Sequence, residues 1–240
     1  MKMKYKFLFL FAAILIICTP QFSKGSIEAV SPDEADRVLK ELFSKNIDMY
    51  NKYRGVESLR NEVVSEYEHK TNKLLSVSEI TVTRTDFFYE MPVAEVKAYK
   101  KDGKVMKPSK FNYIKGMPSF PVFDEKGRDN YDIRITEKKI FNGKECYQVQ
   151  VTPKKETARH FKGFLYYTVK NLDLVYFEGT LAKLDFPMKS FKLEFNTVMY
   201  NGIPVGSNGK AVFRVKIPIL YPDTQIVSNI TVLETKLIPL

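Results

Sequence analysis

The chain has 240 residues, of which 44% are hydrophobic and 28% are charged, a balance typical of a globular protein. Its 38 basic and 28 acidic residues give a formal net charge of +10. This excess of base is moderate and dispersed, which argues against a nucleic-acid partner in a chain that begins like an exported protein. Anionic lipid headgroups and acidic proteins remain as partners for a basic surface, and a solvated lysine-rich surface is the alternative.

Residues 1–25 have the layout of an export signal. Three lysines precede an apolar run at residues 7–17, and a polar tract with small residues follows. The run is shorter than the roughly 20 residues of a transmembrane helix. We therefore expect residues 1–25 to be a signal peptide and residues 26–240 to form one exported, periplasmic domain. Removal of this segment takes away four lysines and no acid, which leaves 34 − 28 = +6.

The two cysteines have separate fates in this interpretation. Cys18 follows a sequence that vaguely resembles a lipoprotein processing box, although Ile17 is larger than the residue such a box requires. Cleavage near Gly25 is favoured, and a lipid anchor at Cys18 is the alternative. Cleavage would leave Cys146 without a disulfide partner, so the mature chain would depend on its hydrophobic core.

An amphipathic helix is expected at residues 32–53. Ser31 can cap its start, and Glu34 completes a capping box. Gly55 is expected to end it. Apolar side chains recur at helical spacing opposite a charged face, among them Leu39, Leu42 and Phe43.

The chain after this helix predicts strands. About ten segments show alternating apolar and polar residues or aromatic and β-branched runs. Turn signals separate many of them, at Asp102-Gly103, Asn142-Gly143, Asn201-Gly202 and Asn208-Gly209. So long a meander cannot stay flat, and it must curl around something apolar. The expected fold class is mainly β with α, a curved antiparallel sheet that forms an incomplete β-barrel covered by the N-terminal helix and a long loop.

The long loop is expected at residues 107–130, which contain three prolines and several aromatic residues. Loops of this length in compact domains are usually functional or mobile. We expect the loop and the helix to lie over the concave face of the sheet, with Phe120 and Phe123 facing a ligand, and we expect both to move during ligand exchange.

The sequence offers little for catalysis. His69 and His160 are not at metal-ligand spacing from each other or from Cys146. No nucleophile elbow, phosphate-binding glycine loop or zinc-protease motif is present. Cys146 lies in an apolar strand pattern typical of a packed residue, and Glu178 is expected to point outward or to pair with a lysine. We therefore expect no enzyme, no metal and no cofactor.

Residues 160–180, HFKGFLYYTVKNLDLVYFEGT, predict a hairpin that is apolar on both faces over much of its length. One face can pack the core or line a cavity. The candidate cavity residues of this hairpin are Leu165, Tyr167, Leu174 and Tyr176. The densest basic patch, Arg159, His160 and Lys162, could receive a phosphate, a lipid headgroup or a partner protein, and a solvated loop is the alternative.

This half of the chain resembles bacterial outer-membrane lipoprotein-sorting proteins, the LolA/LolB-like superfamily. The resemblance rests on Tyr147-x-Val149-x-Val151-Thr152-Pro153, Gly163-x-Leu165-Tyr166-Tyr167 and Leu172-Asp173-Leu174-Val175 with Glu178-Gly179. It implies an incomplete β-barrel whose open mouth is covered by helices and a loop, around an apolar cavity that holds acyl chains. The arginine-proline element of the family has no counterpart, because Arg84 is followed by Thr85.

The leading expectation is an exported, non-enzymatic carrier or binding protein for lipid or acylated (lipoprotein) cargo. Its partners would be acyl chains and a membrane-bound donor or acceptor protein, with no nucleic acid. A periplasmic sensor or scaffold of the same fold, which binds a partner protein without lipid, is the alternative. A hydrolase without recognisable motifs is the third hypothesis.

Overall fold

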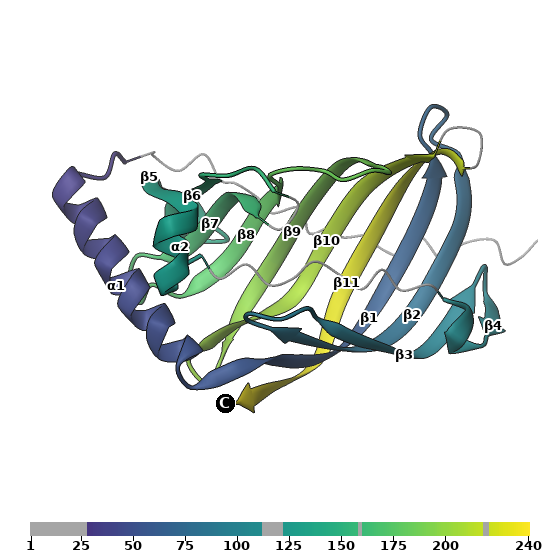
Figure 1. The fold of residues 1–240 in the computed structure, drawn as a ribbon, viewed down its shortest axis with the longest axis horizontal. Coiled ribbons are helices and arrows are strands. Elements are labelled where there is room, and N and C mark those ends of the chain that lie inside the picture. Colours follow the sequence, from purple (N-terminus) through teal and green to yellow (C-terminus); the bar gives the residue numbers. More distant parts are fainter. Residues whose placement is uncertain (1–27, 112–121, 158–159, 218–220) are drawn as a thin grey trace, which may run out of the picture.

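The computed structural model of the chain describes residues 28–111, 122–157, 160–217 and 221–240. The expected signal peptide, Cys18, Phe120 and Arg159 lie outside the described residues. The elements are α1 (Pro32–Tyr50), β1 (Tyr53–Glu68), β2 (Leu74–Phe87), β3 (Val93–Lys101), β4 (Lys104–Met106), a 3₁₀ turn (Pro108–Lys110), α2 (Glu125–Asn130), β5 (Tyr131–Phe141), β6 (Lys144–Pro153), β7 (Phe161–Thr168), β8 (Leu174–Leu181), β9 (Met188–Tyr200), β10 (Ile203–Ile217) and β11 (Tyr221–Pro239) (Figure 1).

Helix α1 starts as its sequence predicts. The Ser31 side chain accepts a hydrogen bond from the backbone N–H of Glu34 at 3.2 Å. The helix ends at Tyr50, however, and Gly55 lies in strand β1 instead of ending the helix. A Cβ atom at Gly55 would come within 2.5 Å of the Asp86 carbonyl oxygen, so the glycine allows the close approach of β2.

The strands form one 11-stranded antiparallel sheet in the order β4-β3-β2-β1-β11-β10-β9-β8-β7-β6-β5. The expected turns at Asp102-Gly103, Asn142-Gly143 and Asn201-Gly202 are confirmed, and both residues of each turn have positive φ. The expected turn at Asn208-Gly209 is wrong. These residues lie inside β10, where a register shift between Gly206 and Asn208 marks a β-bulge.

The order of the strands explains why the sheet stays open. The chain enters at β1 in the middle of the sheet and proceeds to the edge strand β4. Residues 107–130 then lead to β5 at the opposite edge, and the chain returns strand by strand until β11 pairs with β1. The two edges do not pair, so the expected incomplete barrel is confirmed.

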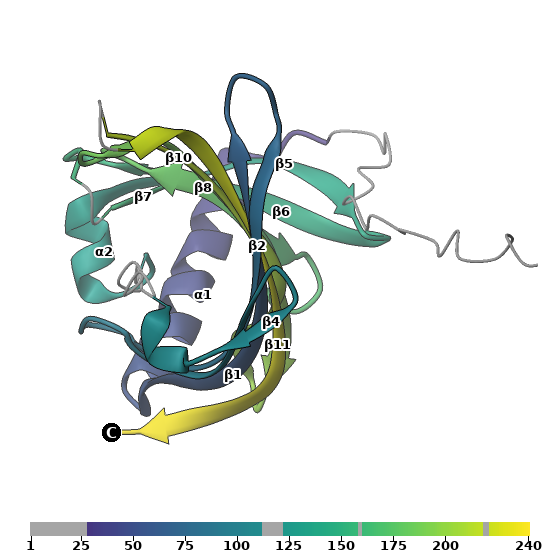
Figure 2. The ribbon, with the colours of Figure 1, turned by 90° about the vertical axis from the view of Figure 1, so that its right-hand side faces the viewer.

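The described parts of the expected loop at residues 107–130 include regular structure. They contain the 3₁₀ turn at one end and α2 at the other, whose Asp124 cap accepts the N–H of Gly127 at 2.5 Å. The sheet curves around α1, which lies on its concave side together with α2 (Figure 2). Helix and sheet therefore meet on one face, and this face contains the main core.

Candidate functional site

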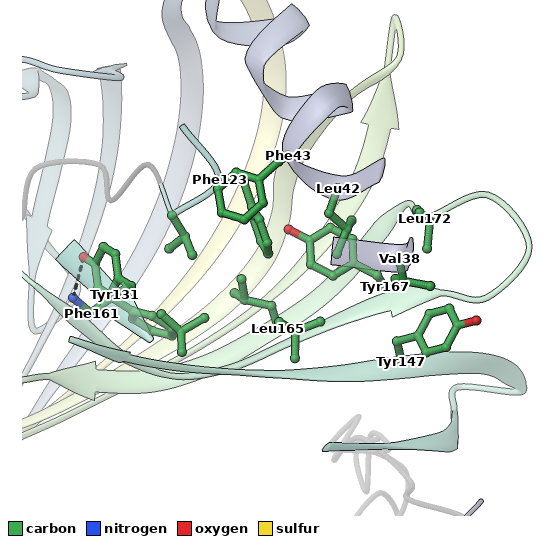
Figure 3. Packing of buried hydrophobic residues seen from close by; sticks show 13 residues of the cluster. Val38, Leu42, Phe43, Phe123, Tyr131, Tyr147, Phe161, Leu165, Tyr167 and Leu172 are labelled. Atoms are coloured by element: carbon green, nitrogen blue, oxygen red, sulfur yellow. Dashed lines mark hydrogen bonds between the residues drawn. The ribbon is translucent and has the colours of Figure 1, made fainter. Parts of the chain in front are cut away.

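Helix α1 covers one half of the concave face, which we call the packed half. The main cluster of buried apolar residues joins α1 and residues 122–123 to strands β5–β8 (Figure 3). Leu42 is 0% exposed and Val38 1% exposed. The Phe123 ring makes edge contacts with Phe43 and Tyr167, at centroid distances of 5.3 and 5.7 Å. The packed half is therefore a filled core.

Polar contacts fix α1 near both of its ends. Near its start, Glu34 accepts a 2.6 Å hydrogen bond from the Tyr147 hydroxyl and pairs with Lys138 at 2.9 Å. These two partners lower the pKa of the Glu34 carboxyl below its usual value. Farther along, Lys45 donates to Asp173 at 2.8 Å and to the carbonyl oxygen of Asn171 at 3.0 Å. The helix is tied to the sheet at two places.

The same face continues beyond α1 as a strip that is only partly covered, which we call the open strip. Cross-strand partners point to the same side of a sheet. One such line runs through Val151, Gly163, Gly179, Leu193, Ala211, Ser228, Val64 and Ser78. Most apolar residues of the open strip have intermediate exposure, namely Phe191, Leu193, Ala211, Phe213, Val215, Ile230, Val232 and Val64, whereas Ile226, the cross-strand partner of Phe213, is buried.

Aromatic rings lying flat on the sheet connect the packed half to the open strip. Phe177 stacks on Phe195 with a centroid distance of 5.8 Å and an interplanar angle of 11°, and Phe161 contacts Phe177 edge-on at 6.3 Å. Glycines make this arrangement possible. A Cβ atom at Gly179 would collide with the Phe161 ring, and one at Gly209 would collide with the Phe195 ring.

The concave face becomes polar toward β1 and β2. Asp86 pairs with Arg60 at 2.5 Å and with Arg84 at 2.7 Å, and all three side chains are less than a quarter exposed. Burial opposes the ionisation of Asp86, but the two guanidinium groups outweigh it and hold the pKa of this carboxyl below its usual value. Ser228, which is 7% exposed, has a hydroxyl without a hydrogen-bond partner among the described residues.

The residues that the sequence suggested for the cavity mostly belong to the packed half. Leu42, Phe43, Phe123, Leu165 and Tyr167 are buried in the main cluster, and Leu39 and Leu174 pack against it. The structure thus brings these seven side chains together.

Tyr176 lies apart from them. A register shift pairs Tyr166 with Tyr176 but Tyr167 with Leu174, so Tyr176 points to the convex side. There it joins Phe141, Cys146 and Tyr166 in a second buried cluster.

The basic patch is only partly described. Lys162 is exposed, whereas the Nδ1 atom of His160 lies 2.8 Å from the Lys155 carbonyl oxygen. The His160 ring also contacts Tyr131 at a centroid distance of 5.4 Å. Phe161, which lies between these two residues, is buried in the main cluster. The part of the basic patch that the structure describes is therefore His160 and Lys162, at the β6–β7 connection.

Sequence reasoning recognised strands β9, β10 and β11 but missed the open strip on them. The signal that could have found it is the set of glycines inside strands, because Gly179, Gly206 and Gly209 oppose aromatic residues on neighbouring strands.

The two residues that the sequence considered for catalysis, Cys146 and Glu178, are engaged in packing or in hydrogen bonds. Cys146 is 0% exposed, and burial raises the pKa of its thiol to about 11, which disfavours a thiolate nucleophile. Glu178 accepts from the Tyr166 hydroxyl at 3.0 Å and faces Lys192 at 3.9 Å, as the sequence suggested. No three acidic, histidine or cysteine side chains of the described part gather where they could hold a metal ion. None of the helices in the described ranges has the length and hydropathy of a membrane-crossing helix.

Comparison with known proteins gives similarity in fold only. No protein-family model matches the chain, and no curated protein matches it. Among solved structures, an outer membrane lipoprotein-sorting protein domain from Vibrio parahaemolyticus is 9% identical with a TM-score of 0.44, covering 86% of this chain and 93% of the other. A LolA superfamily protein from Nitrosomonas europaea is 10% identical with a TM-score of 0.42, covering 84% and 94%. A DUF1329 family protein from Desulfovibrio piger is 14% identical with a TM-score of 0.39, covering 83% and 92%. Two of these three structures carry the name of the superfamily that the sequence resembles.

Proposed function

We propose that the protein is an exported, non-enzymatic binding protein that holds the acyl chains of a lipid or of an acylated protein along the open strip. Residues 1–25 would serve as the signal peptide, and residues 26–240 would form the periplasmic binding domain. His160, Lys162 and the neighbouring Arg159 would meet a headgroup or a partner protein at the β6–β7 connection.

The observation that carries this proposal is the difference in solvent exposure between the packed half and the open strip of the same face. A run of apolar side chains on β9–β11 and β1 keeps intermediate exposure, directly beside a half whose core is closed. Partly exposed apolar strips on a concave surface suit a chain-like apolar ligand, because each buried methylene group contributes about 0.8 kcal/mol.

The polar groups beside the strip suit an amphipathic ligand. The ion-paired Arg60, Asp86 and Arg84 lie on the same face farther toward β2, where a purely apolar ligand would find no complement.

The test compares two neighbouring positions of β10 that face opposite sides of the sheet. Phe213→Asp places a charge in the open strip, whereas Val212→Asp places the same charge on the convex face. We expect Phe213→Asp to weaken binding of a fluorescent fatty acid about tenfold or more and Val212→Asp to leave it unchanged. Circular dichroism confirms that both variants fold.

Native mass spectrometry of the gently purified protein complements this test. Bound lipid in the parent and its loss in Phe213→Asp would support carriage. A parent that binds no acyl probe, or two variants that bind alike, would contradict the proposal and favour the scaffold that binds only a partner protein.

A further inference from the structure

Three connections at one end of the strands lie next to each other and form a surface that we call the lysine rim. It consists of residues 68–75 between β1 and β2, residues 182–190 between β8 and β9, and residues 214–217 with 222–223 at the ends of β10 and β11. The backbone N–H of His69 donates to the Asp223 carbonyl at 2.9 Å, and that of Lys216 donates to the Pro187 carbonyl at 3.2 Å. These bonds join the three connections along one end of the sheet, at the top in Figure 1.

The charge of the rim is unbalanced. Its segments contain six bases and three acids, and five of the bases are exposed lysines: Lys70, Lys73, Lys183, Lys189 and Lys216. Asp223 does not offset them, because it pairs with Arg214 at 2.5 Å, which lowers the pKa of the Asp223 carboxyl to about 2. Glu68 accepts the Thr71 hydroxyl at 2.5 Å, so Asp185 is the one fully exposed acid of these segments.

Large apolar side chains stand among these lysines. Phe186 is 70% exposed, Leu74 is 49% exposed and Leu75 is 45% exposed. Phe186 lies between Lys183 and Lys189 in the chain, and the two leucines follow Lys73 directly. Exposed apolar groups cost free energy in water, whereas lysines flanking apolar tips match the interface of an anionic bilayer, where both groups find partners.

The opposite end of the strands shows that exposed apolar groups alone do not single out the rim. Tyr89, Met91 and Val93 are 57%, 55% and 60% exposed in and beside the β2–β3 turn. The charges there are paired, since Arg54 donates to both carboxylate oxygens of Glu90 at 2.8 and 3.0 Å. In the rim, by contrast, the apolar tips stand beside exposed lysines for which the described residues provide no ion pair.

We propose that the lysine rim docks the protein on the surface of an anionic membrane, with Phe186, Leu74 and Leu75 entering the headgroup region and the lysines contacting lipid phosphates. Each lysine close to an anionic surface raises partitioning roughly fivefold, and salt weakens the attraction by screening. Docking of this end is independent of whether the open strip holds acyl chains.

Sedimentation with lipid vesicles tests the proposal. The protein is used in the form that an expressing bacterium exports, with its N-terminus determined by mass spectrometry so that all variants share it. We expect binding to vesicles of phosphatidylglycerol and phosphatidylcholine mixed in equal parts, no binding to phosphatidylcholine alone, and loss of binding near 1 M salt, where the Debye length falls to about 3 Å.

Variants of equal net charge separate the rim from a general effect of basicity. Replacement of Lys70, Lys73 and Lys183 by Gln should weaken binding to the anionic vesicles about tenfold or more. Replacement of Lys52, Lys144 and Lys170 by Gln, at the opposite end, should leave it within about twofold. Phe186→Ser should also weaken binding, and Met91→Ser should not.

Three results would overturn the docking surface. Equal losses in the two lysine triplets would show an attraction spread over the whole molecule, and binding to phosphatidylcholine as tight as to anionic vesicles would show that charge is irrelevant. A parent protein that stays in solution with anionic vesicles would also refute the docking proposal. As a control, binding of the fatty-acid probe by the rim variants would show that their open strip is intact.

Discussion

The packed half and the open strip belong to one face of one sheet, yet they end in different states. In the packed half, α1 adds Val38, Leu42 and Phe43 to the sheet and leaves the cluster almost without exposed surface. In the open strip, equally apolar residues such as Phe213 and Leu193 remain partly exposed. The strand patterns are alike, so the difference lies in what covers them. A helix that is too narrow for the sheet completes one core and leaves a partly exposed apolar strip beside it.

This difference changes the role of α1 in ligand exchange. Sequence reasoning treated the helix as a cover that must move. Its buried residues and its contacts through Glu34 and Lys45 tie it to the sheet, and we therefore expect it to act as part of the scaffold. Because the open strip is already partly exposed, a ligand can reach it while α1 stays in place.

The largest expected effect separates the two regions by stability. Leu42→Ala removes a fully buried side chain from the packed half and should lower the free energy of unfolding by about 3 kcal/mol. Phe213→Ala removes a larger side chain from the open strip, but its partial exposure limits the loss to about 1 kcal/mol. Urea unfolding measures both. Equal losses would mean that the strip is as well packed as the core.

The ion-paired cluster on β1 and β2 should give the next largest effect. Asp86→Asn leaves Arg60 and Arg84 without their counter-charge and should cost about 2 kcal/mol near neutral pH. The pKa of Asp86 is lower in the folded than in the unfolded state, so its contribution is present above the unfolded pKa of about 4 and is lost as the pH falls through the folded value.

The pH dependence supplies the check on this prediction. The difference in unfolding free energy between parent and Asp86→Asn should shrink as the pH falls from about 4 through the lower folded pKa of Asp86, because below that pKa the Asp86 side chain is as neutral as that of Asn. A difference that persists unchanged in acid would assign the effect to lost packing.

The sequence predicted the fold class because its local signals agree. Ser31 and Glu34 mark the start of α1, and the alternation of Phe191, Leu193 and Phe195 marks a strand with one apolar face. The alternation does not show what covers that face, because the cover depends on which of the eleven strands α1 packs against. The open strip therefore could not be predicted from the sequence, although the alternation did place its residues on the same side of the sheet.

β-Bulges and contacts between residues far apart in the sequence account for the remaining differences between the sequence-based predictions and the structure. Tyr176 has the period of a concave residue with Leu174, but a bulge turns it to the convex face. The cluster of Arg60 and Asp86 joins residues 26 positions apart. Strand register decides both features, and register follows from the whole sheet rather than from local patterns.

A buried thiol on the convex face and a thiol placed in the open strip should differ in reactivity. Cys146→Ala should cost only about 1 kcal/mol, since it removes one small buried group from the second cluster, on the convex face. In the native protein, burial and a pKa of about 11 should make Cys146 inert to thiol reagents at neutral pH. A cysteine introduced by Ala211→Cys in a Cys146→Ala background should react about a hundredfold faster. Similar rates for the two thiols would show that both sites are equally covered.

The smallest expected effect concerns the attachment of α1. Lys45→Met keeps the apolar stem but removes the donor to Asp173 and to the Asn171 carbonyl, and it should cost about 0.5 kcal/mol because the pair is partly exposed. Lys40→Met is the matched control, since Lys40 is 79% exposed and faces Asp36 only at 4.0 Å. Hydrogen exchange should show faster exchange of the α1 amides in Lys45→Met alone. If fatty-acid binding is unchanged while α1 exchanges faster, the helix is scaffold, whereas a parallel rise in ligand exchange rate would restore α1 as the moving cover.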